Sequence, residues 1–322
     1  MKKNDEKFCG VWKLDKPIYC KKEVSGKNFI TKIGGVDVVV AFPICPDTYD
    51  ANSHSLQAGD LITPIGLFDK GINWGMIHAW PEGLFSVNAI VCTCLGDEED
   101  VHKIYSDFPR WKEKFYNLIL IKSGDYIQPE QKMPTLLQHG NGIYDGLEMF
   151  RFELGKPLVR VKNCRKLDPI TIQFISSEGC YDEVGLKLLF ENAGSDKEIM
   201  LSYELLIVAY RAVFRHDFRS AIVIAATALE RAILYKVEKY YLDNNLTTFE
   251  DDKKQHKMLG NLFRWLNELN ISIPVGDYQT EILDVRNPTA HEGENQSYEI
   301  TKRYLEKCKV MIQNYCNCVL EK

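Results

Sequence analysis

The sequence predicts an α+β protein in which a β-rich domain is followed by an all-helical domain. The chain has 322 residues, about twice the length of a typical domain. In residues 1–195, short apolar runs of the strand type are separated by Gly, Pro and polar residues. From residue 196 onward, apolar residues recur every three or four positions, as they do on one face of a helix. We therefore place the domain boundary near Gly194-Ser195, which gives domains 1–195 and 196–322.

The predicted strands and one helix of the first domain follow from these patterns. Acidic residues begin the segment Asp97–Lys122, and apolar residues at helical spacing follow them, so it is expected to be helical. Pro109 interrupts this pattern, which allows either two helices or one kinked helix. Leu154-Gly155-Lys156-Pro157 is expected to connect two strands as a hairpin. The predicted strands are Val36–Phe42, Leu61–Phe68, Phe85–Cys94, Met149–Glu153, Leu158–Lys162 and Thr171–Ile175.

Five helices are predicted for the second domain. The strongest prediction is Phe218–Leu242, which contains no Gly or Pro and keeps a spacing of three to four residues between apolar positions. The others are Asp196–Phe214, Met258–Leu269, Tyr278–Arg286 and Ser297–Leu320. Thr247–Lys254 is expected to be a charged loop. Because the connections are short, we expect an antiparallel helical bundle.

Composition and charge exclude several classes of protein. With 45% hydrophobic and 26% charged residues, the chain has the composition of a soluble globular protein and not of a collagen-like or disordered one. The formal charge is −5, and the charges are evenly spread, since residues 196–322 contain 17 Lys and Arg against 19 Asp and Glu. Bulk electrostatics therefore predicts neither a nucleic-acid nor a membrane partner, and any anion site must be local.

The compartment is predicted from what the sequence lacks. No apolar run approaches the roughly 20 residues needed to span a bilayer, and the N-terminus has no apolar core of a signal peptide. We therefore expect a cytoplasmic protein without a membrane partner, whose ten cysteines are mostly reduced and buried. Cys92-Thr93-Cys94 with His78 and His102 is one candidate zinc site. A C-x-C pair on a core strand makes a poor zinc site when no second cysteine pair follows it. We therefore expect neither a metal nor a cofactor.

Arg286 and His291 form the most distinctive local pattern of the helical domain. On a regular helix, five residues rotate by about 500°, which would place the two side chains about 140° apart. Pro288 lacks an N–H group and disfavours helical geometry at Asn287. We therefore expect the helix to end near Arg286 and the following turn to bring His291 to the same opening.

Glu230 is the second unusual residue of this domain. It lies in the middle of the apolar helix Phe218–Leu242, where a carboxylate is rarely buried without a partner. Its neighbour Arg231 points about 100° away around the helix and is poorly placed to pair with it. Arg286 or His291 from across the bundle is the expected partner.

The helical domain resembles the HEPN superfamily (higher eukaryotes and prokaryotes nucleotide-binding). The resemblance covers residues 196–322 only and includes a bundle of about 125 residues, AATALE in the second helix and RNPTAH before the last one. The family signature is an Arg, a polar residue, a few variable positions and a His, which correspond here to Arg286, Asn287 and His291. The acidic residue of the family corresponds to Glu230.

The resemblance implies a metal-independent endoribonuclease that needs no cofactor. His291 would be the general acid or base for a ribose 2′-hydroxyl or a leaving 5′-oxygen, and Arg286 would stabilise the phosphate. Asn287 would donate to a phosphate oxygen or fix the turn, and Glu230 would orient Arg286 or His291. Family members typically dimerise so that two motifs share one cleft, and a homodimer through the helical domain is therefore expected.

The biological role is an expectation by analogy with prokaryotic toxins and antiphage abortive-infection proteins. Residues 1–195 would then be a recognition or regulatory domain that binds a phage-derived or cellular trigger, and RNA would be the substrate. The alternative is a catalytically inactive HEPN-fold module for binding or dimerisation, with a ligand-sensing N-terminal domain. Arg286 and His291 would then only neutralise a helix C-terminus, and Glu230 would form a structural ion pair.

Overall fold

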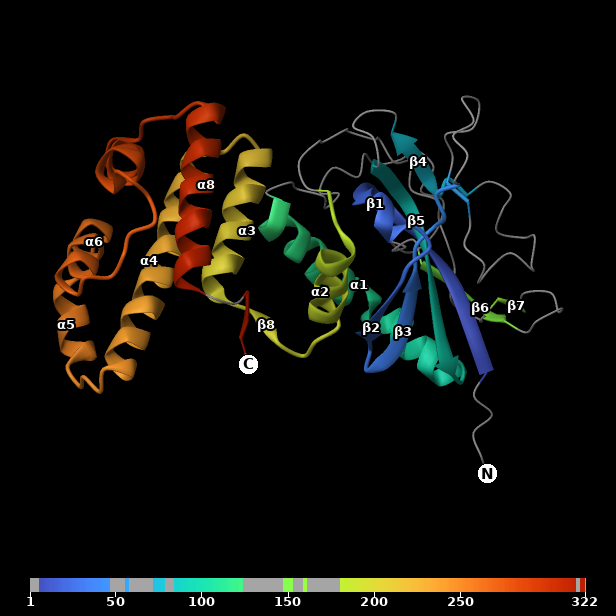
Figure 1. Cartoon of the computed structure of the whole chain (residues 1–322). Coiled ribbons are helices and arrows are strands. Elements are labelled where there is room, and N and C mark those ends of the chain that lie inside the picture. The colour runs from blue at the N-terminus through green and yellow to red at the C-terminus, as the bar shows by residue number, and fades with distance from the viewer. Residues whose placement is uncertain are drawn as a thin grey trace. The chain divides into compact units, whose positions relative to one another are not determined.

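The computed structural model describes residues 6–46, 56–57, 72–78, 84–123, 147–152, 159–160, 180–316 and 319–321. The chain divides into two compact units, Met1–Ser195 and Asp196–Lys322. The first unit contains an antiparallel sheet and the second consists mainly of helices (Figure 1). The predicted order, a strand-containing part followed by helices, is confirmed, and the division falls where the periodicity of the sequence changes.

The sheet of the first unit is antiparallel throughout its described pairings. Its strand order is β2-β3-β5-β1-β6-β7, and β4 also pairs with β5. The strands are β1 (Glu6–Lys21), β2 (Asn28–Ile33), β3 (Val36–Ala41), β4 (Gly75–His78), β5 (Leu84–Gly96), β6 (Leu147–Phe152) and β7 (Val159–Arg160). A short 3₁₀ helix, η1 (Lys22–Val24), follows β1.

The strands predicted at the positions of β3, β5, β6 and β7 are confirmed, whereas β1, β2 and β4 were not predicted. The structure shows that β1 lies between β5 and β6 and buries Phe8, Trp12 and Leu14 on one face and Cys9 and Val11 on the other. Because both faces are buried, this part of the sequence does not alternate between apolar and polar residues. The predicted strands Leu61–Phe68 and Thr171–Ile175 and the predicted hairpin at 154–157 lie outside the described residues.

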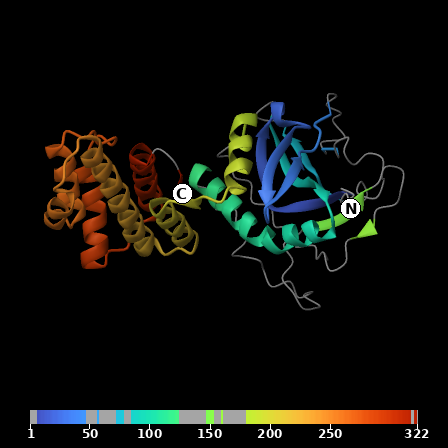
Figure 2. The same cartoon turned by 90° about the horizontal axis from the view of Figure 1, so that it is seen from below.

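Helix α1 (Glu98–Ser123) contacts β2, β3 and β5 and runs alongside the sheet (Figure 2). It is one continuous helix with Pro109 inside, so of the two alternatives that the sequence left open, two separate helices are excluded. The Trp12 ring of β1 packs edge-on against Phe108 and Phe115 of α1, with ring centroids 5.3 Å apart in each case. A second helix, α2 (Glu183–Ala193), was not predicted and contacts both β2 and α1.

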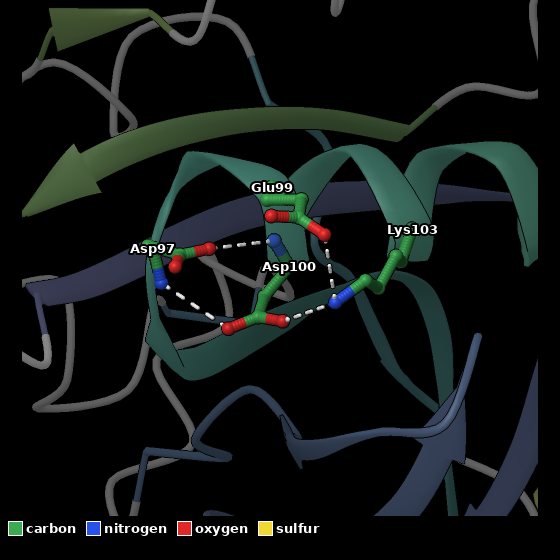
Figure 3. A network of polar contacts seen from close by, with 4 residues as sticks. All are labelled: Asp97, Glu99, Asp100 and Lys103. Carbon is green, nitrogen blue, oxygen red and sulfur yellow. Dashed lines mark hydrogen bonds and ion pairs between the residues drawn. The ribbon is translucent and has the colours of Figure 1, made fainter. Parts of the chain in front are cut away.

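Paired hydrogen bonds close the first turn of α1 (Figure 3). The backbone N–H of Asp100 donates to Oδ1 of Asp97 over 3.0 Å, and the N–H of Asp97 donates to Oδ2 of Asp100 over 3.3 Å. Lys103 Nζ lies 3.0 Å from Asp100 and 3.4 Å from Glu99. The hydrogen bond from Lys103 lowers the pKa of Asp100. The acidic residues at the start of α1 therefore cap the helix.

The second unit contains the helices α3 (Leu201–Phe214), α4 (Phe218–Asp243), α5 (Phe249–Gln255), α6 (Leu259–Glu268), α7 (Asp284–Asn287) and α8 (Tyr298–Tyr315). Two π-helical segments flank α7, namely η2 (Gln279–Leu283) and η3 (Pro288–Glu292). Strands β8 (Glu198–Ile199) and β9 (Leu320–Glu321) form an antiparallel pair. Helices are confirmed at the positions of α3, α4, α6 and α8, and η2 with α7 takes the place of the predicted helix Tyr278–Arg286. The predictions Asp196–Phe214 and Ser297–Leu320 extend too far, because Glu198–Ile199 is β8 and Leu320 lies in β9.

The prediction of a charged loop at Thr247–Lys254 is wrong, because this segment contains α5. Its first turn is acidic and its last turn is basic, which complements the helix dipole. Ion pairs join Glu250 to Lys253 over 3.5 Å and Asp251 to Lys254 over 2.8 Å. The charges that made the segment resemble a loop therefore stabilise a short helix.

The direction of the helices differs in part from the prediction. Helix α3 runs antiparallel to α8, since Tyr203 near its start donates to the carbonyl of Cys316 just after the end of α8. Helices α4 and α8 begin at the same end of the unit, because the rings of their first residues, Phe218 and Tyr298, lie 6.2 Å apart. The two helices also contact each other along their length (Figure 1). A wholly antiparallel bundle is therefore not observed.

None of the helices in the described segments is both long enough and apolar enough to cross a membrane.

Candidate active site

The motif Arg286 to His291 lies in a continuous helical segment. Asn287 and Pro288 both have helical backbone angles, with φ and ψ of −66° and −48° for Asn287 and −61° and −41° for Pro288. The prediction that the helix ends near Arg286 is therefore wrong. The segment continues as η3 to Glu292 and ends at Gly293, whose φ of +74° is left-handed.

The π-helical geometry of η3 begins at Pro288. A π-helix bonds each residue to the residue five positions away. The carbonyl oxygen of Pro288 accepts a hydrogen bond from the N–H of Gly293, five residues later. The missing N–H and the ring of Pro288 instead affect the carbonyl group of Asp284, four residues earlier. In a π-helix, residues five positions apart also lie close to one face.

Arg286 and His291 are brought together by this spacing. Nη1 of Arg286 lies 2.8 Å from Nε2 of His291, within hydrogen-bonding distance. A guanidinium group carries donors only, so Nε2 of His291 is the acceptor in this bond and the ring proton is on Nδ1. His291 is exposed and Arg286 is half-buried. The predicted convergence of the two side chains is thus present, although a π-helix and not a turn produces it.

Asn287 contacts the same nitrogen atom. Its Oδ1 accepts a hydrogen bond of 3.2 Å from Nη1 of Arg286, and its side chain is exposed. Nη1 therefore donates to both Asn287 and His291, and these two contacts fix the orientation of the guanidinium plane. Within the described residues, Nη2 of Arg286 makes no hydrogen bond and its buried Nε has no partner. Nη2 is therefore left for other contacts, whereas Nε is buried.

Glu230 approaches the motif from α4. The helix contacts both α7 and η3, and the carboxyl group of Glu230 is half-buried. Burial raises its pKa, while the positive charge of Arg286, and to a smaller extent that of Arg231, lowers it. Among the described residues, Glu230 forms no ion pair within 4.0 Å. Arg286 is therefore its main electrostatic neighbour, as the sequence led us to expect, but a direct contact is not formed.

Tyr304 of α8 completes the inner side of the site and was missed by the sequence analysis. Its ring is fully buried, and burial raises the pKa of its hydroxyl well above the usual value. The hydroxyl also interacts electrostatically with Arg286 and Glu230. Tyr304 lies on the apolar face of α8 next to Leu305 and Cys308, and Cys308 affects its hydroxyl more than either charged group does. The sequence therefore holds no sign of an interaction with Arg286 and Glu230.

Arg219 at the start of α4 is a further residue that the sequence did not single out. An added Cβ at Gly293 would lie 3.6 Å from Nη1 of Arg219, which places this guanidinium beside the turn that ends η3. Gly293 follows His291 by two residues. The Arg219 side chain is exposed and makes no hydrogen bond or ion pair to the described residues. A second cation therefore lies close to the motif.

Cys92 and Cys94 of the candidate zinc site both lie in β5 and are buried. Burial raises the pKa of each thiol to about 12, so both are protonated at neutral pH when no metal is bound. The eight cysteines within the described segments are free. No group of three or more His, Cys, Asp or Glu residues suited to a metal ion is found in those segments, and the side chain of His78 is not described.

Comparison of the chain with protein-family models finds no match. Comparison with curated proteins and with solved structures finds no match either.

Proposed function

We propose that residues 196–322 form a HEPN-like endoribonuclease domain in which His291 and Arg286 cleave RNA without a metal ion. The observation that carries this proposal is the 2.8 Å contact between Nη1 of Arg286 and Nε2 of His291 at an exposed position. It joins a group that transfers protons near neutral pH to a permanent cation that binds phosphate in a bidentate manner. The half-buried Glu230 behind them adds the acidic residue that the family resemblance requires.

The reaction begins at the ribose next to the scissile phosphate. Nε2 of His291 accepts the proton of the 2′-hydroxyl, and the 2′-oxygen attacks phosphorus. The bond from phosphorus to the 5′-oxygen breaks, and a general acid protonates that oxygen. The products are a 2′,3′-cyclic phosphate and a 5′-hydroxyl. For Nε2 to act as the base, Arg286 must release it, and an entering phosphate would compete for the guanidinium.

Arg286 supplies the charge that this transition state needs. Negative charge builds up on the equatorial oxygens of a pentacoordinate phosphorus, where fixed cationic donors stabilise it best. Nη2, which has no hydrogen-bond partner among the described residues, can donate to one of those oxygens. Asn287 then keeps the guanidinium plane in place through its 3.2 Å contact with Nη1. Glu230 favours the same orientation electrostatically.

A homodimer is part of the proposed enzyme, because one motif supplies a single histidine. A second copy of the chain would provide the general acid from its own His291 in a shared cleft. We further propose that the protein acts in the cytoplasm as a toxin or in antiphage defence, and that residues 1–195 recognise a trigger. Light scattering after size-exclusion chromatography tests the dimer, and a strict monomer at micromolar concentration would contradict the shared cleft.

Cleavage of labelled RNA by the purified full-length protein tests the reaction itself. His291→Ala and Arg286→Ala are each expected to abolish cleavage, whereas His102→Ala, at an exposed histidine of α1, is expected to leave it unchanged. Cleavage in EDTA and products that end in a cyclic phosphate are also expected. Activity that survives both substitutions would contradict the site, and activity lost in EDTA would contradict the mechanism.

A non-catalytic binding or dimerisation module is the second candidate. One observation favours it, namely that Arg286 occupies the base nitrogen of His291 in this conformation. Such a pair can also be a structural bond that holds η3 in place. RNA binding and cleavage are measured with and without infected-cell extract as the source of a trigger. A dimer that binds RNA or a nucleotide but cleaves no RNA in either case would favour this candidate over the enzyme.

A further inference from the structure

Three aromatic rings form a continuous surface at the end of the helical unit where α4 and α8 begin. The ring of His216 lies 5.9 Å from that of Phe218, and the ring of Phe218 lies 6.2 Å from that of Tyr298. We call these three residues the aromatic rim. His216 and Tyr298 are exposed, and the exposed fraction of Tyr298 is 47%. The rings pack on one another, and their exposed parts are accessible to a ligand with flat aromatic groups.

Arg219 connects the aromatic rim to the proposed active site. It directly follows Phe218 in α4, and its guanidinium lies beside Gly293, two residues after His291. Figure 1 shows the first turns of α4 and α8 at the same end of the unit, with the chain from η3 leading into α8 there. From His291 through Gly293 and Arg219, the surface therefore continues to the rings of the rim.

The charges around this surface are mixed. Asp217 accepts from the N–H of Ser220 as the cap of α4. Its hydrogen bonds with Ser220 lower the pKa of Asp217, and Arg219 lowers it further by a smaller amount. Glu292 and Glu294 are exposed on either side of Gly293. These carboxylates repel an extended row of phosphates. A nucleic acid can therefore be bound through its phosphates only at a few points, namely the guanidinium groups of Arg219 and Arg286. The rest of its binding energy must come from contacts with its bases.

We propose that the aromatic rim and Arg219 form a binding site for single-stranded RNA next to the scissile phosphate. A base stacks on Tyr298 and Phe218, and Arg219 binds a phosphate adjacent to the one at Arg286. This inference rests on the proposed function and extends it by naming the substrate class. Bases in a duplex are stacked on one another and cannot reach the rings, whereas unpaired bases can.

The number of phosphate contacts sets the salt dependence of binding. Each phosphate that is neutralised on a single strand contributes about 0.7 to the slope of log affinity against log salt concentration. With two guanidinium contacts, the slope is expected to be about −1.4, which is shallow for a nucleic-acid-binding protein. Substitution of Arg219 by alanine should reduce the magnitude of this slope by about 0.7. Substitution of Tyr298 by alanine should weaken binding without changing the slope.

Binding is measured with the full-length protein carrying His291→Ala, so that the probe is not cut. The probe is a fluorescein-labelled single strand of about 12 nucleotides, compared with a duplex of the same sequence in fluorescence anisotropy. Tyr298→Ala is expected to weaken binding of the single strand by about five- to a hundredfold, which corresponds to the loss of one stacked base. Tyr298→Phe, which keeps the ring, and Arg264→Ala, at an exposed arginine of α6, are the matched controls.

Cleavage by the otherwise unchanged protein separates this inference from the proposed function. If the protein cleaves RNA through His291 but Tyr298→Ala and Arg219→Ala have no effect on KM or on binding, the rim inference is overturned and the proposed function stands. If no RNA is cleaved while both variants weaken binding of the single strand, the binding site stands without the enzyme. Equal affinity for duplex and single strand, or no binding of either, also overturns the inference.

Discussion

Glu230 of α4 and Arg286 of α7 interact electrostatically without forming an ion pair within 4.0 Å. The arginine lowers the pKa of the carboxyl group, but burial raises it by more, so the net pKa of Glu230 is higher than usual. A carboxylate that is partly desolvated and incompletely paired costs stability when it is ionised. A destabilising carboxylate at this position is consistent with a functional role, since function and stability often conflict at such sites.

Glu230→Gln is therefore expected to raise Tm at neutral pH while lowering cleavage. Because the pKa of Glu230 is raised in the folded state, its contribution to stability is fully present below its unfolded value near 4.5 and is lost as pH rises through the folded value. Glutamine never ionises, so the difference in Tm between variant and wild type should emerge above pH 4.5 and vanish toward it. Thermal unfolding across this pH range measures the difference.

Glu238→Gln is the matched control for this prediction. Glu238 is an exposed residue of the same helix, two turns after Glu230, and its substitution should change neither Tm nor cleavage. A lower Tm for Glu230→Gln at neutral pH would show that the attraction of Arg286 outweighs burial. The carboxylate would then be a structural partner of Arg286, as in the alternative interpretation of the sequence.

Arg286→Lys is expected to reduce cleavage by about a hundredfold although the positive charge remains. Lysine carries one compact ammonium group and cannot contact His291, Asn287 and a phosphate at once, as the planar guanidinium can. Initial cleavage rates of both proteins at the same pH measure the effect. Arg264→Lys on α6 should retain full activity. Full activity of Arg286→Lys would mean that only the charge is required.

The sequence predicted the elements whose periodicity is regular and missed those that depend on contacts far apart in the chain. Phe218–Leu242 was predicted nearly to its ends because burial on one face repeats along all of α4. Strand β1 was missed because its position between β5 and β6 depends on pairing with residues 84–96 and 147–152. Helix α5 was missed because its stability comes from charge pairs that resemble a loop in the sequence.

The candidate site was predicted in composition but not in geometry. Arg286 and His291 meet as we expected from a turn after Pro288, yet the actual reason, a π-helical segment, is not visible in a spacing of five residues. Tyr304 and Arg219 were missed for a different reason. Their approach to the motif depends on how α4 and α8 pack, which local sequence patterns do not encode.

Cys92 and Cys94 are expected to resist alkylation in the folded protein. Burial raises the pKa of both thiols to about 12, so at pH 8 only about one part in 10⁴ is thiolate, the reactive form. The pKa of Cys180 is also raised but its side chain is partly exposed, so it should react faster. Iodoacetamide treatment followed by peptide mass spectrometry measures each site. Rapid alkylation of Cys92 at pH 8 would contradict the packing of β5.

Pro288→Ala is expected to raise stability and to lower cleavage at the same time. Alanine restores an N–H group that can bond to the carbonyl oxygen of Asp284 and removes the ring that disfavours an α-helix, a gain of at most about 3 kcal/mol. A regular α-helix would then rotate His291 about 140° away from Arg286 and break their 2.8 Å contact. A misplaced base of this kind costs about a hundredfold in rate. Thermal unfolding and cleavage rates of the same preparation measure both effects. If Pro288→Ala cleaves RNA at the wild-type rate, the contact between Arg286 and His291 does not depend on the proline.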